Sequence, residues 1–172
     1  LWRIPAGREL VKVSHISEQA WGGAFVADTV LVARKAWDLA RYDLSAPGKA
    51  IELPNSAFPQ SRLVAAHPAT RTFAVAPEAP NLPAQLRVFT PGGDSFVEKL
   101  SHNLSAPAVY LAINADASRA VATLRTGNLE VASTTKADEP TLKIPGKFQR
   151  ADFAGPAGRL VAVAPHTLKA DL

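Results

Sequence analysis

The run Ser118-Arg-Ala-Val-Ala-Thr123 has three counterparts elsewhere in the chain, and their spacing decides the fold. Each run is short, apolar and rich in small or β-branched residues, which is typical of a buried β-strand. The starts of successive runs are separated by 43, 47 and 41 residues. The other runs are Asp28-Thr-Val-Leu-Val-Ala33, Arg71-Thr-Phe-Ala-Val-Ala76 and Arg159-Leu-Val-Ala-Val-Ala164. The chain is therefore built from repeats.

A second recurring pattern has the same period. An aromatic residue ends one strand, a turn containing glycine follows, and an alternating strand leads away. Glycine suits a hairpin turn because its φ can become positive without steric cost. The three copies span residues 2–13, 42–53 and 89–100, with Gly7, Gly48 and Gly93 in their turns. A fourth copy, Val131 to Ile144, keeps the strands but has no glycine between them.

Four short strands in each period of about 40 residues are typical of a β-propeller blade. A single blade cannot cover its own apolar faces, so blades must pack side by side around an axis. An immunoglobulin-like sandwich also has short strands, but it does not predict self-similarity at this longer period. The sequence therefore predicts an all-β fold of four-stranded antiparallel propeller blades, with about four repeats and no convincing helix.

The segment Arg41-Tyr42-Asp43-Leu44, which precedes a glycine turn, resembles the closing strand of a WD-repeat blade. Leu1-Trp2-Arg3-Ile4 is similar, with Arg3 in place of the expected Asp. The Gly-His signature that opens such repeats is missing from every copy, so the resemblance is to WD-repeat-like propellers as a group. It implies a ring of about six to eight blades. The alternative is a ring of four, closed by pairing the N-terminal outer strand with the inner strands of the last repeat.

The two registers together predict where each blade begins and ends. The boundaries are 1–13 for the end of one blade, 22–54, 59–100 and 106–145 for three blades, and 149–172 for the start of another. An isolated arc would expose apolar blade faces at both ends. The chain also begins with Leu1 and contains no Met. We therefore expect a piece of a larger ring, completed by blades from the same gene product or from a second copy.

Composition excludes several classes of protein. Hydrophobic residues make up 47% of the chain and charged residues 20%, which is typical of a folded globular domain. The net charge is +4, but Lys and Arg are scattered, so no nucleic-acid surface is predicted. No apolar run is long enough to span a membrane. The absence of cysteine excludes disulfides. The composition, rich in Ala and Pro, suggests a bacterial protein of either the cytoplasm or the periplasm.

The sequence contains no phosphate-binding glycine loop, no G-x-S-x-G motif and no clustered metal ligands. No catalytic residue, metal or cofactor is therefore predicted, and the sequence favours a protein that is not an enzyme. The four histidines fall at different points of the repeat, so they are interpreted as ordinary loop histidines; His102 is expected in a connection between blades.

Loops that join the second and third strands of propeller blades usually share one face with the loops between blades. That face is the predicted binding surface, and Trp37 beside two basic residues has the composition of an interaction hot spot. The alternative is that Trp37 only covers a blade edge. The candidate binding residues are Arg34, Lys35, Trp37, Glu78, Arg125, Arg150 and His166.

Two functions remain open from the sequence. The first is a non-catalytic scaffold that binds a protein or peptide on the loop face, which rests on analogy with other propellers. The second is a propeller enzyme or ligand sensor whose axial site is completed by blades outside this chain. Titratable side chains from three or more blades that converge at the axis with strongly shifted pKa values would favour the second.

Overall fold

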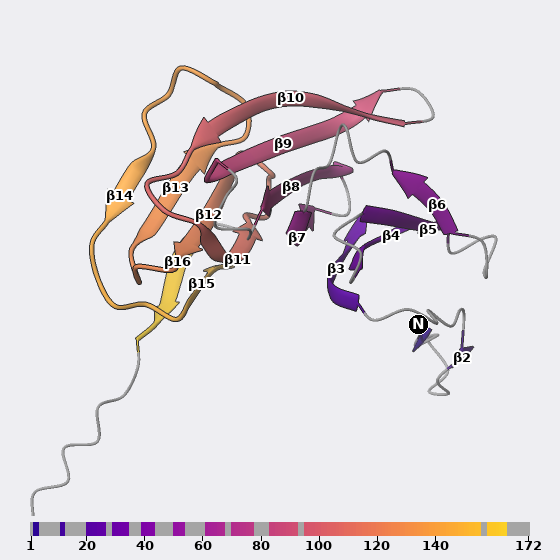
Figure 1. The fold of residues 1–172 in the computed structure, drawn as a ribbon, viewed down its shortest axis with the longest axis horizontal. Coiled ribbons are helices and arrows are strands. Elements are labelled where there is room, and N and C mark those ends of the chain that lie inside the picture. Colours follow the sequence, from indigo (N-terminus) through magenta and orange to yellow (C-terminus); the bar gives the residue numbers. More distant parts are fainter. Residues whose placement is uncertain are drawn as a thin grey trace, which may run out of the picture.

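The computed structural model of the chain is made of β-strands and turns, and it contains no helix in the part that it describes. The strands follow one another in sequence order along a curve (Figure 1). The described residues are 2–3, 11–12, 20–26, 29–34, 39–43, 50–53, 61–67, 70–77, 83–92, 95–155 and 158–164.

Three complete antiparallel sheets of four strands each account for most of the structure. The first sheet contains β3 (Ala20–Val26), β4 (Thr29–Arg34), β5 (Leu39–Asp43) and β6 (Ala50–Leu53). The second sheet contains β7 (Ser61–His67), β8 (Thr72–Pro77), β9 (Gln85–Gly92) and β10 (Ser95–Asn103). The third sheet contains β11 (Ala108–Ile113), β12 (Arg119–Leu124), β13 (Leu129–Ser133) and β14 (Leu142–Ile144).

Two hairpins flank these sheets along the chain. One pairs β1 (Trp2–Arg3) with β2 (Val11–Lys12), and the other pairs β15 (Arg150–Ala154) with β16 (Arg159–Val163). Every strand pairs with its neighbour in sequence in an up-and-down meander. The predicted all-β architecture of four-stranded antiparallel sheets is confirmed. The glycine turns at Gly7, Gly48 and Gly93 lie outside the described residues.

The recurring apolar runs occupy the same place in each unit. They form the second strand of each unit: β4, β8, β12 and β16. The first three of these lie between two other strands, and β16 lies beside β15. The first strands, β3, β7, β11 and β15, contact one another from unit to unit. The sheets are therefore set radially, with their first strands innermost and their fourth strands outermost.

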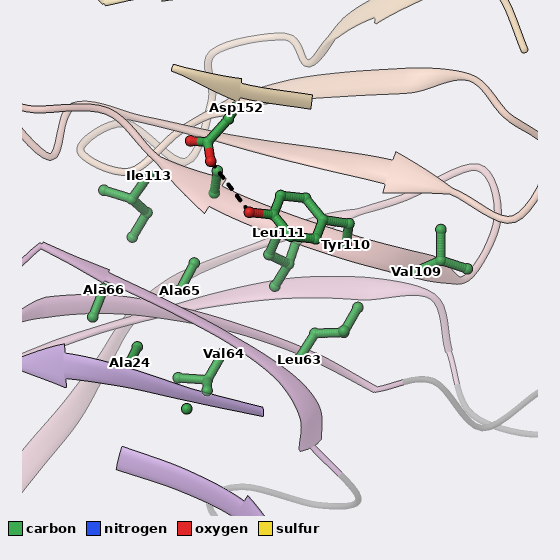
Figure 2. Close-up of a pocket in the computed structure, with 12 residues that line it drawn as sticks. Ala24, Leu63, Val64, Ala65, Ala66, Val109, Tyr110, Leu111, Ile113 and Asp152 are labelled. Atoms are coloured by element: carbon green, nitrogen blue, oxygen red, sulfur yellow. Dashed lines mark hydrogen bonds between the residues drawn. The ribbon is translucent and has the colours of Figure 1, made fainter. Parts of the chain in front are cut away.

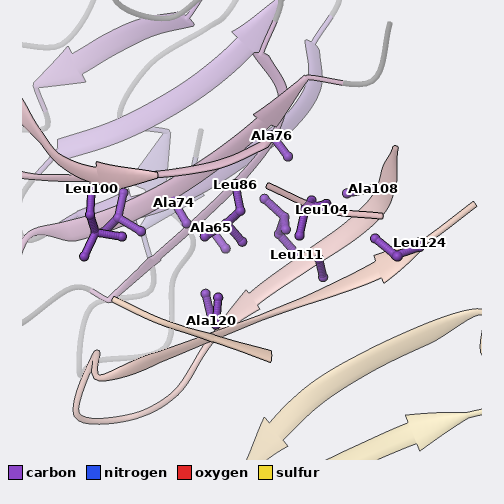
Figure 3. Packing of buried hydrophobic residues seen from close by; sticks show 13 residues of the cluster. Ala65, Ala74, Ala76, Leu86, Leu100, Leu104, Ala108, Leu111, Ala120 and Leu124 are labelled. Carbon is purple, nitrogen blue, oxygen red and sulfur yellow. The ribbon is translucent and has the colours of Figure 1, made fainter. Parts of the chain in front are cut away.

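A buried apolar cluster fills the space between the second and third sheets (Figure 3). It is made mostly of alanine and leucine, and the alanines allow the inner strands of the two sheets to approach closely. The members labelled in Figure 3 are Ala65, Ala74, Ala76, Leu86, Leu100, Leu104, Ala108, Leu111, Ala120 and Leu124. Neither sheet could bury these side chains alone.

Aromatic side chains fill the opposite face of the second sheet. Phe73 on β8 stacks on Phe89 on β9, with ring centroids 5.2 Å apart, and meets the ring of Phe96 on β10 edge to face at 4.8 Å. Val26 of the first sheet belongs to the same buried cluster. The second sheet therefore packs through phenylalanine on one face and through alanine and leucine on the other.

The turn between the first and second strands has the same backbone feature in three successive units. Arg71, Ala117 and Gly158 each have positive φ, at 54°, 55° and 63°. In the third sheet, Asn114 holds this turn by accepting a hydrogen bond from Arg119 N at 2.8 Å on its side-chain oxygen. Two hydrogen bonds from Ser118 keep the pKa of the Asp116 carboxyl below its ordinary value. The repeat thus extends to the turn geometry.

The turn between the second and third strands of the third sheet is held by the connection that follows β14. Gly127 lies at the centre of this turn with φ of +87°. Its carbonyl accepts a hydrogen bond from Phe148 N at 2.8 Å, and the Asn128 side chain accepts one from Gly146 N at 3.1 Å. In the third sheet, this turn and the connection to the next unit therefore lie side by side.

His102 differs from the sequence expectation. It lies within β10 rather than in a connection, and only 6% of it is exposed. Its Nε2 donates a hydrogen bond to the carbonyl oxygen of Ser133, at the end of β13, over 2.7 Å. The side chain thus joins the outer strand of the second sheet to the third sheet. A spacing argument cannot detect this role, because the histidine is not repeated.

Thr123 on β12 offers a test of the packing. Its Oγ1 is fully buried and, among the described residues, has no hydrogen-bond partner. Thr123→Val replaces the hydroxyl by a methyl group of similar size, so it removes the desolvation cost of an unsatisfied polar group. We expect the free energy of unfolding to rise by about 1 kcal/mol. Urea denaturation followed by circular dichroism measures the change.

Thr123→Ser is the matched control for this prediction. It keeps the hydroxyl and deletes the methyl group, so it is expected to lower stability by about 1 kcal/mol. A valine variant less stable than the wild type would show that the hydroxyl is satisfied in solution.

Candidate functional site

A pocket of about 470 Å³ opens where the innermost strands of successive units meet (Figure 2). β7 and β11 supply most of its wall, β3 supplies two residues and β15 supplies one. The lining residues are Gly23, Ala24, Leu63, Val64, Ala65, Ala66, Val109, Tyr110, Leu111, Ala112, Ile113 and Asp152. The pocket is therefore axial, because the first strands of the radial sheets converge there.

Main-chain groups also lie along the wall of this pocket. In the described part of the chain, β7 pairs only with β8, and β11 pairs only with β12. Both strands therefore present a free edge, whose alternate N–H and C=O groups point away from the sheet. The consecutive lining residues 63–66 and 109–113 lie along these edges. The wall combines apolar side chains with available hydrogen-bonding groups.

Two polar side chains meet at one part of the wall (Figure 2). The hydroxyl of Tyr110, on β11, donates a hydrogen bond to Oδ2 of Asp152, on β15, over 3.2 Å. The other carboxylate oxygen, Oδ1, accepts a hydrogen bond from Phe153 N at 2.8 Å. Because the two side chains come from adjacent units, their contact depends on the radial packing.

Arg150, the first residue of β15, completes this polar group. Its guanidinium carbon lies 4.3 Å from the centre of the Tyr110 ring, within the range of a cation–π contact. Its Nη2 lies 3.6 Å from Asp152 Oδ2, and the two side chains are 59% and 50% exposed. An ion pair this exposed contributes little to stability. The three residues form what we call the Tyr-Asp-Arg group: Tyr110, Asp152 and Arg150.

The pKa of the Tyr110 phenol is raised in this environment. Burial is the largest cause of a raised pKa of Tyr110, and the negative charge of Asp152 raises it further, while Arg150 opposes the change. Because the pKa of the folded state exceeds that of the unfolded chain, the phenol's contribution to stability is complete below about pH 10 and falls at higher pH.

Asp152→Asn removes the charge and is expected to lower the pKa of Tyr110 toward its ordinary value. Titration of the phenolate absorbance in a Tyr42→Phe background reports Tyr110 alone, because the chain has two tyrosines. A pKa unchanged in the Asn variant would contradict the contact between Tyr110 and Asp152.

The structure describes the side chains of two of the seven candidate binding residues. Arg150 is half exposed and belongs to the Tyr-Asp-Arg group. Arg125 is exposed in the turn after β12, and its N–H donates to the carbonyl of Pro107 in the connection ahead of β11. Arg34 ends β4, but its side chain is outside the described part. Lys35, Trp37, Glu78 and His166 lie outside the described residues.

Tyr110 and Asp152 were missed by the sequence analysis, which placed the site on loops alone. Both lie on first strands, at nearly the same point of successive repeats. The radial arrangement turns first strands toward the axis, so a polar side chain on such a strand is a usable signal. Among the described residues there is no group of three or more His, Cys, Asp or Glu side chains that could hold a metal ion. The part described also contains no helix able to cross a membrane.

No protein-family model matches the chain, and no curated protein matches its sequence. The fold, however, is similar to solved structures. One is the β-propeller domain of Cps50 (Swd1) from Myceliophteria thermophila, with a TM-score of 0.66 and 13% identity over 86% of this chain and 50% of that one. Another is hydrazine synthase from Kuenenia stuttgartiensis, with a TM-score of 0.64 and 11% identity over 91% of this chain and 45% of that one.

These likenesses define the class of the protein by its fold. It is a repeat protein of radial four-stranded antiparallel sheets around an axis. The fold is the β-propeller, with a loose resemblance to WD-repeat propellers, and the prediction made from the repeat period is confirmed. The chain spans about half the length of each of these two proteins.

Proposed function

We propose that this chain is a non-catalytic propeller module that binds a protein or peptide, and that the axial pocket and the adjoining loop face form its binding surface. One observation carries the proposal: the free edges of β7 and β11 line a pocket large enough for a side chain. Main-chain edges beside apolar pockets are a recurrent means of peptide recognition, since the edges give affinity and the pockets give specificity.

The loop face extends this surface beyond the pocket. Arg150 is the first residue of β15 and follows the connection whose Phe148 N–H binds the Gly127 carbonyl. Arg125 lies in the turn that contains Gly127, between β12 and β13. Both side chains are exposed, and arginine is enriched at interaction hot spots. A bound peptide would therefore meet basic side chains as it leaves the pocket. We include Arg34, Lys35, Trp37, Glu78 and His166 in the proposed loop face on the sequence argument alone.

An axial ligand sensor or enzyme is the second candidate function. It is favoured by the position of Tyr110 and Asp152 in the pocket and by the raised pKa of Tyr110, because shifted pKa values in a pocket are one mark of reactive sites. The similarity to hydrazine synthase concerns the fold and does not transfer its activity. The two candidates differ in what binds: a peptide that extends over the loops, or a small molecule confined to the axis.

We also propose that further blades complete the ring, supplied by the same gene product or by a second copy of this chain. Val161 and Val163 on β16 are 53% and 55% exposed, although both lie on a strand. Their shared face has the apolar character of the faces that neighbouring sheets cover elsewhere. Size-exclusion chromatography with light scattering, applied to this chain and to the full gene product, distinguishes a second copy from further blades of one polypeptide.

Peptide display against the protein tests the binding proposal. We expect enriched peptides whose affinity falls about tenfold or more in Val109→Glu, because Val109 lines the pocket and is 38% exposed. Val97→Glu is the matched control, since Val97 is 57% exposed on the outermost strand of its sheet. Equal loss in both variants, or no enriched peptide, would overturn the proposal.

A further inference from the structure

We propose that the axial pocket accepts a protonated primary amine at the end of an apolar stem, bound by the Asp152 carboxylate and the Tyr110 hydroxyl. This inference rests on the proposed binding function and names the chemistry of its ligand. The amine could come from a lysine side chain of the bound peptide or from a free alkylamine. The recognition is the same in both cases.

The polar side chains that line the pocket present acceptors. The carboxylate of Asp152 has room for about four hydrogen bonds, and its contacts with Tyr110, Phe153 N and Arg150 occupy only part of that capacity. Tyr110 uses its proton in the bond to Asp152, so the lone pairs of its oxygen remain as acceptors. An ammonium group has three donors and no acceptor, and it therefore complements this pair.

The rest of the wall suits a hydrocarbon stem. Val109, which is 38% exposed, and the partly buried Leu63, Val64 and Ile113 lie along the two strand edges (Figure 2). A chain of several methylenes can bury its length on such a wall while its charged end reaches the carboxylate. The volume of about 470 Å³ exceeds what one such chain needs.

Arg150 provides a way to distinguish a cationic ligand from an anionic one. Its Nη2 lies 3.6 Å from Oδ2 of the carboxylate that we assign to the ligand, yet Arg150 is not among the residues that line the pocket. Arg150 therefore competes with an incoming amine for Asp152. Were the ligand an anion, Arg150 would attract it and Asp152 would repel it. Substitutions at these two neighbouring positions therefore have opposite effects for the two kinds of ligand.

The experiment titrates N-acetyl-lysine-N-methylamide into the full gene product by isothermal calorimetry. We expect Asp152→Asn to weaken binding about tenfold or more, because it removes the charge-assisted hydrogen bonds while it keeps the shape. Arg150→Gln is expected to tighten binding about threefold, because it removes an exposed competing charge. N-acetyl-norleucine-N-methylamide, which lacks the amine, is expected not to bind. n-Butylamine serves as the free-amine arm.

The results distinguish the two sources of the amine from each other and from a ligand that is not an amine. Tight binding of the lysine amide with weaker butylamine identifies a lysine side chain, and the reverse identifies a free amine; both support the proposal. Norleucine amide that binds as well as the lysine amide, or a weakened Arg150→Gln variant, overturns it. In that case the proposed peptide function still stands if peptides selected by display depend on Val109 but contain no required lysine.

Discussion

Gly127→Ala is expected to lower the free energy of unfolding by about 3 kcal/mol, one of the two largest effects that we anticipate. Gly127 has φ of +87°, a conformation that strains any residue with a Cβ atom. A Cβ at this position would also lie 2.9 Å from Lys147 Cα and 3.1 Å from Gly146 O, both of which are backbone atoms. The turn would have to release the connection after β14. Chemical denaturation followed by tryptophan fluorescence measures the loss.

Gly155→Ala separates the two causes of that loss. Gly155 also has positive φ, at 68°, but a Cβ there would meet nothing within 4 Å. This control therefore keeps the conformational strain and omits the collision, and its cost is expected to be about 1 kcal/mol. Equal losses in the two variants would show that the contact between the Gly127 turn and residue 147 is not formed in solution.

Phe73→Ala is expected to cost about 4 kcal/mol, because it leaves a cavity at the centre of an aromatic cluster. Phe73 is fully buried, stacks on Phe89 and meets Phe96 edge to face. The same cluster includes Val26 of the first sheet, so the cavity would open between two sheets. We expect a lower midpoint in urea, and also loosened protection of β3 in hydrogen exchange.

Phe25→Ala provides the control with the same chemical change. Phe25 lies next to Val26 on β3 but is 50% exposed, so its truncation is expected to cost about 1 kcal/mol. A difference between the two variants of less than about 1 kcal/mol would contradict the packing of the first sheet on the second.

The sequence predicted the fold because the repeat appears in strongly local features. Apolar runs such as residues 118–123 form the second strand of each sheet, and the positive-φ turns recur beside them. These features depend on neighbouring residues, so one sequence is enough to reveal them. The period then supplied the architecture, since sheets of four short strands are stable only when packed against each other.

The candidate site was harder to predict because it depends on contacts between units. Tyr110 and Asp152 are 42 residues apart, and neither belongs to a motif. Their meeting follows from the convergence of first strands, which a pattern of loops and turns does not report. Arg150 was selected as a loop residue, and the structure places it beside this pair. His102 was missed for the same reason, because its partner lies in the next unit.

The extensive contacts between units run from each sheet to the next one in sequence. Such an arrangement behaves thermodynamically as a linear array of coupled modules, in which each interface adds its own free energy. The second sheet is covered on both faces, by the phenylalanine cluster and by the alanine–leucine cluster. Within the described residues, loss of this one sheet would therefore uncouple the first sheet from the third, whereas melting of the β15–β16 hairpin would remove its interface with the third sheet and leave the other sheets coupled.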